Sequence, residues 1–314
     1  AQLAHENWQL GDWGYVWYGN GRLKEVKNPD GSVVKMEYDA LGRRTSKCAQ
    51  GKVTRFFWDG NVLLHEWNHK EEDTPAVVVD VIGMLSYDKV APIENLVTWV
   101  YESGRFVPSA KLVGGERYSI LSDYLGTPIQ AYDARGNIVW ECELDIYGKV
   151  RNLHGEKTFI PFRFSGQYED VETGLYYNRF RYYSPDTGTY ISKDPIGLLG
   201  NNPNLYAYVH DVNSETDVFG LNPIIVIGEG QRRVNRIART LKREGLEVRT
   251  ITDDWAREFK VYDDYKPELH EVQSIEYNRK WIKDRMAEGY DVYDIGGDGR
   301  NSPFYAAEHD EIRK

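Results

Sequence analysis

Acidic side chains and one histidine gather around a glycine-rich stretch near the end of the sequence. The stretch G-G-D-G-R-N-S-P-F-Y follows the run Y-D-V-Y-D-I, so Asp294 leaves a predicted strand and Asp298 lies in the loop behind it. Loops at the carboxyl ends of strands carry the chemistry of many α/β domains. Because carboxylates hold Mg²⁺ in nucleases, Asp294 and Asp298 are candidate metal ligands. Glu308 and His309 are further candidate catalytic groups.

A second candidate site is the turn Gly228–Glu229–Gly230, which precedes a predicted helix over residues 231–244. Free backbone N–H groups at a helix N-terminus suit a phosphate, so Gly228 and Gly230 are candidates for binding NAD or another nucleotide. Arg233 stands where a dinucleotide fingerprint has its third glycine, and Glu229 would repel a phosphate. A strand–turn–helix without a ligand is the alternative.

The predicted helix over 231–244 carries a row of arginines on its polar face: Arg232, Arg236, Arg239 and Arg243. Such a row is a candidate surface for nucleic acid or a nucleotide, and a solvated helix face is the alternative. Residues 222–314 hold 17 Lys and Arg against 19 Asp and Glu, so the region is not basic as a whole. No H-N-H, H-E-x-x-H or zinc-deaminase pattern occurs.

The elements that must position these groups follow from periodicity. Apolar residues at 224–227 predict a short strand, helical spacing continues over 231–244, and a strand is predicted at 246–251. A second helix is predicted over 274–288, ahead of a strand at 290–295. A strand–helix–strand order predicts parallel strands. Residues 222–314 are therefore predicted to form a small α/β domain.

Residues 1–160 show a different pattern, in which an aromatic residue, a turn with Asp and Gly, and a new strand follow one another repeatedly. Examples are Y-D-A-L-G-R-R at 38–44, Y-D-A-R-G-N at 132–137 and D-I-Y-G-K-V at 145–150. Asp and Gly favour tight turns, and short hairpins are stable only when several stack. This region is predicted to be β-rich, with short antiparallel strands.

Residues 161–221 concentrate tyrosines between turn-forming residues and carry three short motifs: D-P-I-G-L at 194–198, N-L-Y-A-Y-V at 204–209 and D-V-F-G-L at 217–221. Together with the Tyr-Asp pairs at 38–39 and 132–133, these motifs resemble the end of the core of Rhs proteins, the bacterial YD-repeat toxins. The resemblance implies a fragment of a hollow β-shell at 1–160, a core-associated segment with an autocleavage motif at 161–221 and a variable toxin domain at 222–314.

The resemblance also implies self-cleavage after the leucine of the last motif, in a reaction that the family assigns to an aspartate pair. Carried over, the scissile bond is Leu221–Asn222 and the pair is Asp194 and Asp217. Two adjacent carboxyls do not both ionise readily, so one would activate water and the other polarise the carbonyl. Val212 and Val218 stand where the family usually has prolines. The alternative is that both aspartates cap turns.

The composition and the N-terminal sequence argue against several classes of protein. The net charge of -10 argues against general nucleic-acid binding along the whole chain. No apolar run is long enough to span a membrane. The N-terminus lacks both an initiator Met and the pattern of a signal peptide. We therefore expect the C-terminal fragment of a longer protein.

The resemblance implies a secreted effector in bacterial competition, whose toxin is delivered into the cytoplasm of the target bacterium. The sequence favours a nucleic-acid-targeting enzyme, and the alternatives are a toxin that consumes or transfers NAD or another nucleotide and a non-enzymatic binding module. Mg²⁺ and NAD are the two candidate cofactors. The expected partners are the upstream part of the Rhs shell, a cognate immunity protein, and the target nucleic acid or nucleotide.

Overall fold

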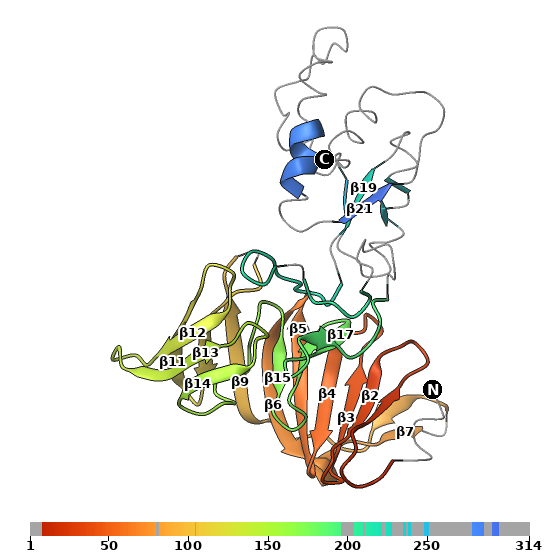
Figure 1. Ribbon diagram of the computed structural model, residues 1–314. Coiled ribbons are helices and arrows are strands. Elements are labelled where there is room, and N and C mark those ends of the chain that lie inside the picture. The colour runs from red at the N-terminus through yellow and green to blue at the C-terminus, as the bar shows by residue number, and fades with distance from the viewer. Residues whose placement is uncertain are drawn as a thin grey trace, which may run out of the picture. The chain divides into compact units, whose positions relative to one another are not determined.

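The computed structural model describes residues 8–79, 82–103, 105–195, 204–209, 211–221, 224–227, 235–236, 238–239, 248–250, 278–285 and 291–294. The chain divides into two compact units, Ala1–Ser192 and Lys193–Lys314. The described part of the first unit is almost entirely strands and turns (Figure 1). No helix among the described residues combines the length and the apolar character that crossing a membrane requires.

Twelve strands of the first unit form one antiparallel sheet in which spatial order follows chain order. They are β1 (Gly14–Trp17), β2 (Leu23–Lys27), β3 (Val33–Tyr38), β4 (Arg44–Ala49), β5 (Lys52–Asp59), β6 (Val62–Lys70), β9 (Glu94–Tyr101), β10 (Pro108–Val113), β11 (Glu116–Ser122), β12 (Pro128–Tyr132), β13 (Ile138–Leu144) and β14 (Val150–His154). Burial alternates along the strands, as at Val34 and Met36 of β3, because successive side chains face opposite sides of a sheet. The predicted short antiparallel strands are confirmed.

Three of the hairpin turns share one hydrogen-bond pattern, which begins at Asp123, Asp133 and Asp145. One carboxylate oxygen of each aspartate accepts the N–H groups of the second and fourth following residues at 2.8–2.9 Å. The glycine three residues after each aspartate has φ between 78° and 90°, a conformation that glycine adopts without strain. The repeated Asp and Gly therefore fix these turns locally.

A second antiparallel sheet covers part of the first and consists of β15 (Tyr168–Asp170), β16 (Leu175–Asn178), β17 (Arg181–Ser184) and β18 (Thr189–Tyr190). Its Leu175, Tyr177 and Tyr182 share one apolar core with residues of β2, β3 and β4. Trp99 and Trp140 belong to a neighbouring core and are fully buried. Most of the tyrosines that the sequence concentrates here are therefore packing residues.

A two-stranded sheet of β7 (Val77–Val79) and β8 (Leu85–Tyr87) lies between β6 and β9 in the sequence and pairs with neither. A single turn of 3₁₀ helix, η1 (Glu71–Asp73), precedes it.

The second unit contains a small parallel sheet. Strand β19 (Ile224–Ile227) pairs in parallel with β20 (Val248–Arg249) and with β21 (Asp291–Asp294). Residues 235–236, 238–239 and 278–285 are helical. The described strands and helical residues lie within the predicted ranges, and the predicted parallel pairing is confirmed.

Candidate functional site

Asp217 begins a turn of the same kind as those in the repeats. Its Oδ1 accepts the N–H of Leu221 at 2.8 Å and the N–H of Phe219 at 3.3 Å. Gly220, three residues after the aspartate, has φ of 66°. Asp217 therefore caps a turn, which is the alternative role that the sequence left open for it. Its carboxylate contacts the residue that precedes the predicted scissile bond.

Burial distinguishes this turn from its counterparts in the repeats. Asp217 is only 1% exposed and Leu221 is buried, whereas Asp123, Asp133 and Asp145 are all partly exposed. In the partly exposed turn, hydrogen bonds from Asn137 and Arg135 lower the pKa of Asp133. Backbone amide donors favour the ionised form of an aspartate, whereas burial of the kind seen at Asp217 opposes it.

Asp194 is also buried, and one short segment contacts the backbone of both aspartates. The N–H of Asp194 donates to the carbonyl of Leu205 at 2.9 Å. The N–H of Asp217 donates to the hydroxyl of Tyr208, which is itself buried, at 3.4 Å. Leu205 and Tyr208 both belong to the motif N-L-Y-A-Y-V, so this motif connects the two chain segments that carry the aspartates.

Several other predicted site residues lie outside the described residues: Asn222, Gly228, Gly230, Arg232, Arg243, Asp298, Glu308 and His309. Asp294 ends strand β21, which is the predicted position at the end of a strand. Arg236 and Arg239 are exposed and Ala238 between them is buried, in keeping with the amphipathic helix that the sequence predicts. Among the described residues, no cluster of three or more His, Cys, Asp or Glu side chains could hold a metal ion.

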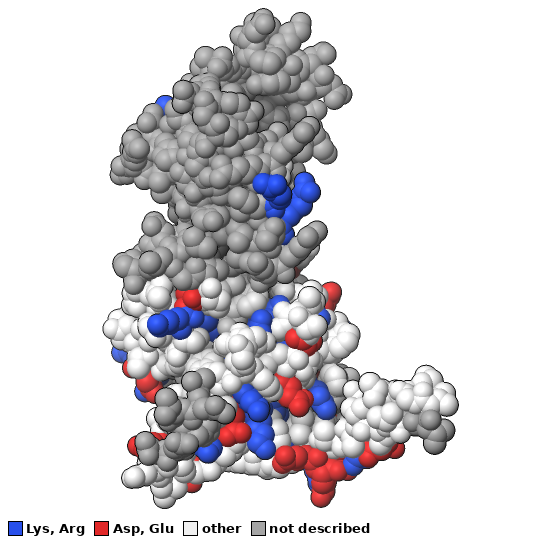
Figure 2. Space-filling model, turned by 90° about the vertical axis from the view of Figure 1, so that its right-hand side faces the viewer, with Lys and Arg blue, Asp and Glu red and all other residues white. Residues whose placement is uncertain are grey.

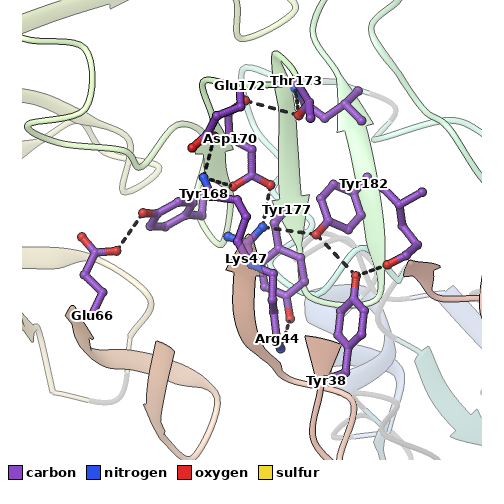
Figure 3. Close-up of polar contacts among 12 residues, drawn as sticks. Tyr38, Arg44, Lys47, Glu66, Tyr168, Asp170, Glu172, Thr173, Tyr177 and Tyr182 are labelled. Atoms are coloured by element: carbon purple, nitrogen blue, oxygen red, sulfur yellow. Dashed lines mark hydrogen bonds and ion pairs between the residues drawn. The ribbon is translucent and has the colours of Figure 1, made fainter. Parts of the chain in front are cut away.

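The first unit contains a buried network of charged groups that sequence reasoning did not find (Figure 3). Asp170, at the end of β15, contacts two cations of β4: Arg44 Nη1 at 2.5 Å and Lys47 Nζ at 3.0 Å. The side chains of Asp170 and Arg44 are 0% and 1% exposed. Arg44 also donates to the hydroxyl of Tyr182 at 3.2 Å, and its backbone N–H donates to the hydroxyl of Tyr177 at 3.0 Å. This network joins the small sheet to the large one.

The electrostatics of the network favour its charged form. Burial by itself would raise the pKa of Asp170, but Arg44 and Lys47 outweigh burial and hold that pKa below its ordinary value. At the edge of the network, burial raises the pKa of Glu66, although the hydroxyl of Tyr168 donates to its carboxylate at 2.7 Å. The centre of the network, Asp170 and Arg44, is shielded from solvent, whereas Glu172 at its edge is 26% exposed. The paired charges at the centre therefore hold the two sheets together.

Two arginines of the aromatic stretch, Arg179 and Arg181, pack on aromatic rings. The guanidinium of Arg179 lies 4.7 Å from the ring centroid of Phe180, and that of Arg181 lies 3.6 Å from the centroid of Tyr190. Such contacts are favourable because a ring face attracts a cation.

Two family models match this chain: the teneurin YD-shell at residues 91–211 and the RHS repeat at residues 17–53. A probable deoxyribonuclease RhsB of Dickeya dadantii (strain 3937) is 31% identical over 226 residues, which are 70% of this chain and 14% of that protein. The double-stranded DNA deaminase toxin A of Burkholderia cenocepacia (strain H111) is 30% identical over 234 residues, which are 69% of this chain and 16% of that protein. The matched part of this chain thus spans about 15% of the length of these relatives.

A solved structure shares the fold of the larger unit. The structure of the Photorhabdus luminescens Tc holotoxin pore matches 67% of this chain and 10% of that chain, with a TM-score of 0.51 and 22% sequence identity. At this identity the likeness concerns the fold alone.

Proposed function

The chain belongs to the Rhs family of YD-repeat polymorphic toxins, and from that premise we propose that it is the C-terminal part of an effector that cuts itself. The shell repeats would end in the segment up to Leu221, and the residues from Asn222 onward would be released as a toxin. Both family models end before residue 222, in keeping with a shared core and a separate tail.

One observation carries the cleavage proposal: the carboxylate of Asp217 is buried and bonded to the N–H of Leu221 at 2.8 Å. With two amide donors, Asp217 suits the ionised partner that takes a proton from water. Asp194 would carry the shared proton and polarise the Leu221 carbonyl. Water then adds to the carbonyl carbon, the bond to the Asn222 nitrogen breaks, and the nitrogen leaves with a proton as a free amine.

Mass spectrometry of the purified chain tests this proposal. We expect two fragments that meet between Leu221 and Asn222, and an intact chain for Asp217→Asn and for Asp194→Asn. Asparagine still accepts N–H groups through its carbonyl oxygen, so Asp217→Asn removes the acid–base function and keeps the turn. Asp145→Asn is the matched control, because Asp145 begins the same kind of turn within the repeats, and this variant should cleave as the wild type does. An uncut wild-type chain, or unchanged cleavage in Asp217→Asn, would refute the assignment.

For the released tail we propose an enzyme that attacks nucleic acid in the cytoplasm of a target bacterium. The names of the two relatives, a deoxyribonuclease and a DNA deaminase, support DNA as the target class. The same relatives differ in chemistry although each matches about 70% of this chain, so the matched part does not determine the reaction. Within the tail, Asp294 and Asp298 are the proposed Mg²⁺ ligands, and the exposed Arg236 and Arg239 are the proposed contacts to phosphate.

Plasmid degradation by residues 222–314, measured with and without Mg²⁺, tests the nuclease. If Asp294→Ala abolishes plasmid cutting and the nearby control Arg300→Ala does not, the nuclease activity is assigned to the glycine-rich loop. Depletion of NAD without plasmid damage would instead support the Gly228–Gly230 site. Toxicity without either activity would favour a binding module. A cognate immunity protein, expressed from the same source, should suppress whichever toxicity is found.

A further inference from the structure

Two aspartate turns follow each other in the segment that precedes the predicted scissile bond. Asp211 begins the first turn, in which the N–H groups of Ser214 and Glu215 donate to its backbone carbonyl at 3.1 and 2.9 Å. Asp217 begins the second turn, whose last N–H belongs to the residue before that bond. Only Thr216 separates the two turns in the sequence, so the conformation of the first turn determines where the second begins.

The first turn is closed by side chains as well as by its backbone. Oδ1 of Asp211 accepts the backbone N–H of Asn213 at 2.9 Å and its side-chain amide at 3.0 Å, and Oδ2 accepts the hydroxyl of Ser214 at 2.9 Å. In return, the carboxylate of Glu215 accepts the N–H of Asp211 at 3.3 Å. Hydrogen bonds from Asn213 and Ser214 lower the pKa of Asp211. The carboxylate of Asp211 therefore holds this turn as a cap holds the first turn of a helix.

Asp211 can act on the scissile bond only through Asp217. Asp211, Asn213 and Ser214 are exposed, whereas Asp217 is buried. The backbone of Asp217 is held at a second point, because its N–H donates to the hydroxyl of the buried Tyr208 at 3.4 Å. A carboxylate that must reach one particular peptide bond depends on such a fixed backbone, since a displacement of about 1 Å can slow a reaction about 100-fold.

Val212 is the residue of the first turn that a proline could replace. Proline is favoured directly after the residue that begins such a turn, because its fixed φ and its missing N–H suit that position. Within the described part of the chain, the N–H of Val212 has no acceptor, so a proline there would break no hydrogen bond. Valine does not fix φ as proline does, and the turn therefore depends on the carboxylate of Asp211.

We propose that Asp211 is a positioning residue for self-cleavage: its turn fixes the backbone of Asp217, so that the Asp217 carboxylate stays beside the predicted scissile bond. This role rests on the proposed function of the segment. The hydrogen bonds of Asp211 would then do what the ring of a proline at position 212 would do. Removal of the Asp211 carboxylate should slow cleavage, and a proline at position 212 should restore it.

Pulse-chase labelling of the full chain in cell-free translation measures the rate of cleavage. We expect Asp211→Ala to be cleaved about tenfold more slowly, because the loss of a cap lowers the population of a capped turn by about this factor. Asp211→Asn should stay within about twofold of the wild type, since asparagine still accepts the N–H of Asn213 through its carbonyl oxygen. Asp211→Ala combined with Val212→Pro should recover the rate of the wild type, which a general loss of stability would not predict.

Asp133→Ala is the matched control. It removes the same kind of carboxylate from a turn of the repeats, and it should be cleaved as the wild type is. Figure 2 shows acidic and basic side chains interspersed over the described surface of the first unit, so the loss of one carboxylate there changes little through charge alone. A control that slows as much as Asp211→Ala would overturn the proposal, because the turn at Asp211 would then have no particular role.

Hydrogen exchange tests the positioning without cleavage, in a chain that carries Asp194→Asn. The N–H groups of Asp217 and Leu221 should exchange about tenfold faster after Asp211→Ala and return to the starting rate after the further change Val212→Pro. Unchanged exchange, normal cleavage of Asp211→Ala, or a double variant as slow as Asp211→Ala would overturn the role of Asp211 and leave the proposed function intact. A wild-type chain that stays uncut would instead refute the proposed function, and the role of Asp211 in cleavage with it.

Discussion

Replacing Asp170 with asparagine removes the one carboxylate that Arg44 and Lys47 share in the buried network (Figure 3). The substitution keeps the shape of the side chain and deletes its charge. Arg44, with a side chain 1% exposed, then holds a charge without a carboxylate partner. Lys47 keeps Glu172, at 2.6 Å.

The expected loss of stability depends mainly on Arg44, because Lys47 keeps a carboxylate partner and Arg44 does not. Removing one partner of a buried ion pair costs about 3–5 kcal/mol, because the other charge stays away from water. Arg44 retains ring contacts with Phe56 and Tyr177, at 4.4 and 4.5 Å from their centroids, which offset part of the loss. We therefore expect the free energy of unfolding of the first unit to fall by about 3 kcal/mol.

Urea unfolding followed by tryptophan fluorescence measures this change, since Trp99 and Trp140 are buried in the first unit. Asp186→Asn is the control. It breaks the Lys149–Asp186 pair, whose side chains are more than half exposed, and it should leave the midpoint unchanged. Equal midpoints for Asp170→Asn and the wild type would refute the reasoning, because a buried guanidinium would then tolerate the loss of its counter-ion.

The same network predicts the sign of the acid dependence. The pKa of Asp170 is lowered in the folded state, so its contribution is complete above the unfolded pKa near 3.9 and is lost as pH falls through the folded value. The wild type should therefore lose stability more steeply below pH 4 than Asp170→Asn does.

Two further predictions concern the first unit. Burial lowers the pKa of Lys111 to about 8, against a smaller opposite effect of Glu66. The unfolded chain therefore binds more protons than the folded chain between pH 8 and 10, and the free energy of unfolding should rise over this range by up to about 3 kcal/mol. Unfolding measured as a function of pH should show this rise in the wild type and not in Lys111→Met. Gly155→Ala should lower the melting temperature more than Gly136→Ala. Both glycines have positive φ, so an alanine is strained at either position. A Cβ at position 155 would in addition lie 2.6 Å from the carbonyl oxygen of Val139, whereas a Cβ at position 136 would meet nothing within 4 Å. Equal effects of the two alanines would show that backbone conformation alone sets the cost.

The hairpin turns and the strand order of the large sheet can be predicted from the sequence, because interactions between neighbouring residues determine them. An aspartate followed by glycine three residues later sets a turn through its own carboxylate and a positive φ, and neither requires a distant partner. Short turns then bring successive strands together, so chain order gives sheet order. The parallel sheet of the tail was equally predictable, because apolar runs and helical spacing alternate there.

The buried network was not predictable for the opposite reason. Arg44 and Asp170 are 126 residues apart in the sequence, and each stands in a motif that resembles an ordinary turn. Only the packing of the small sheet on the large one brings them together.

The turn at Asp217 has a consequence for any mechanism of self-cleavage. Turns at Asp123, Asp133 and Asp145 place a carboxylate on the same two amides with the same glycine geometry, and cleavage at each of them would cut the shell to pieces. The turn alone therefore cannot be sufficient. What the Asp217 turn has in addition is burial and a link through residues 204–209 to a second buried aspartate. Reactivity should then depend on those two features, and a peptide that contains only D-V-F-G-L-N should stay whole under conditions in which the chain is cut.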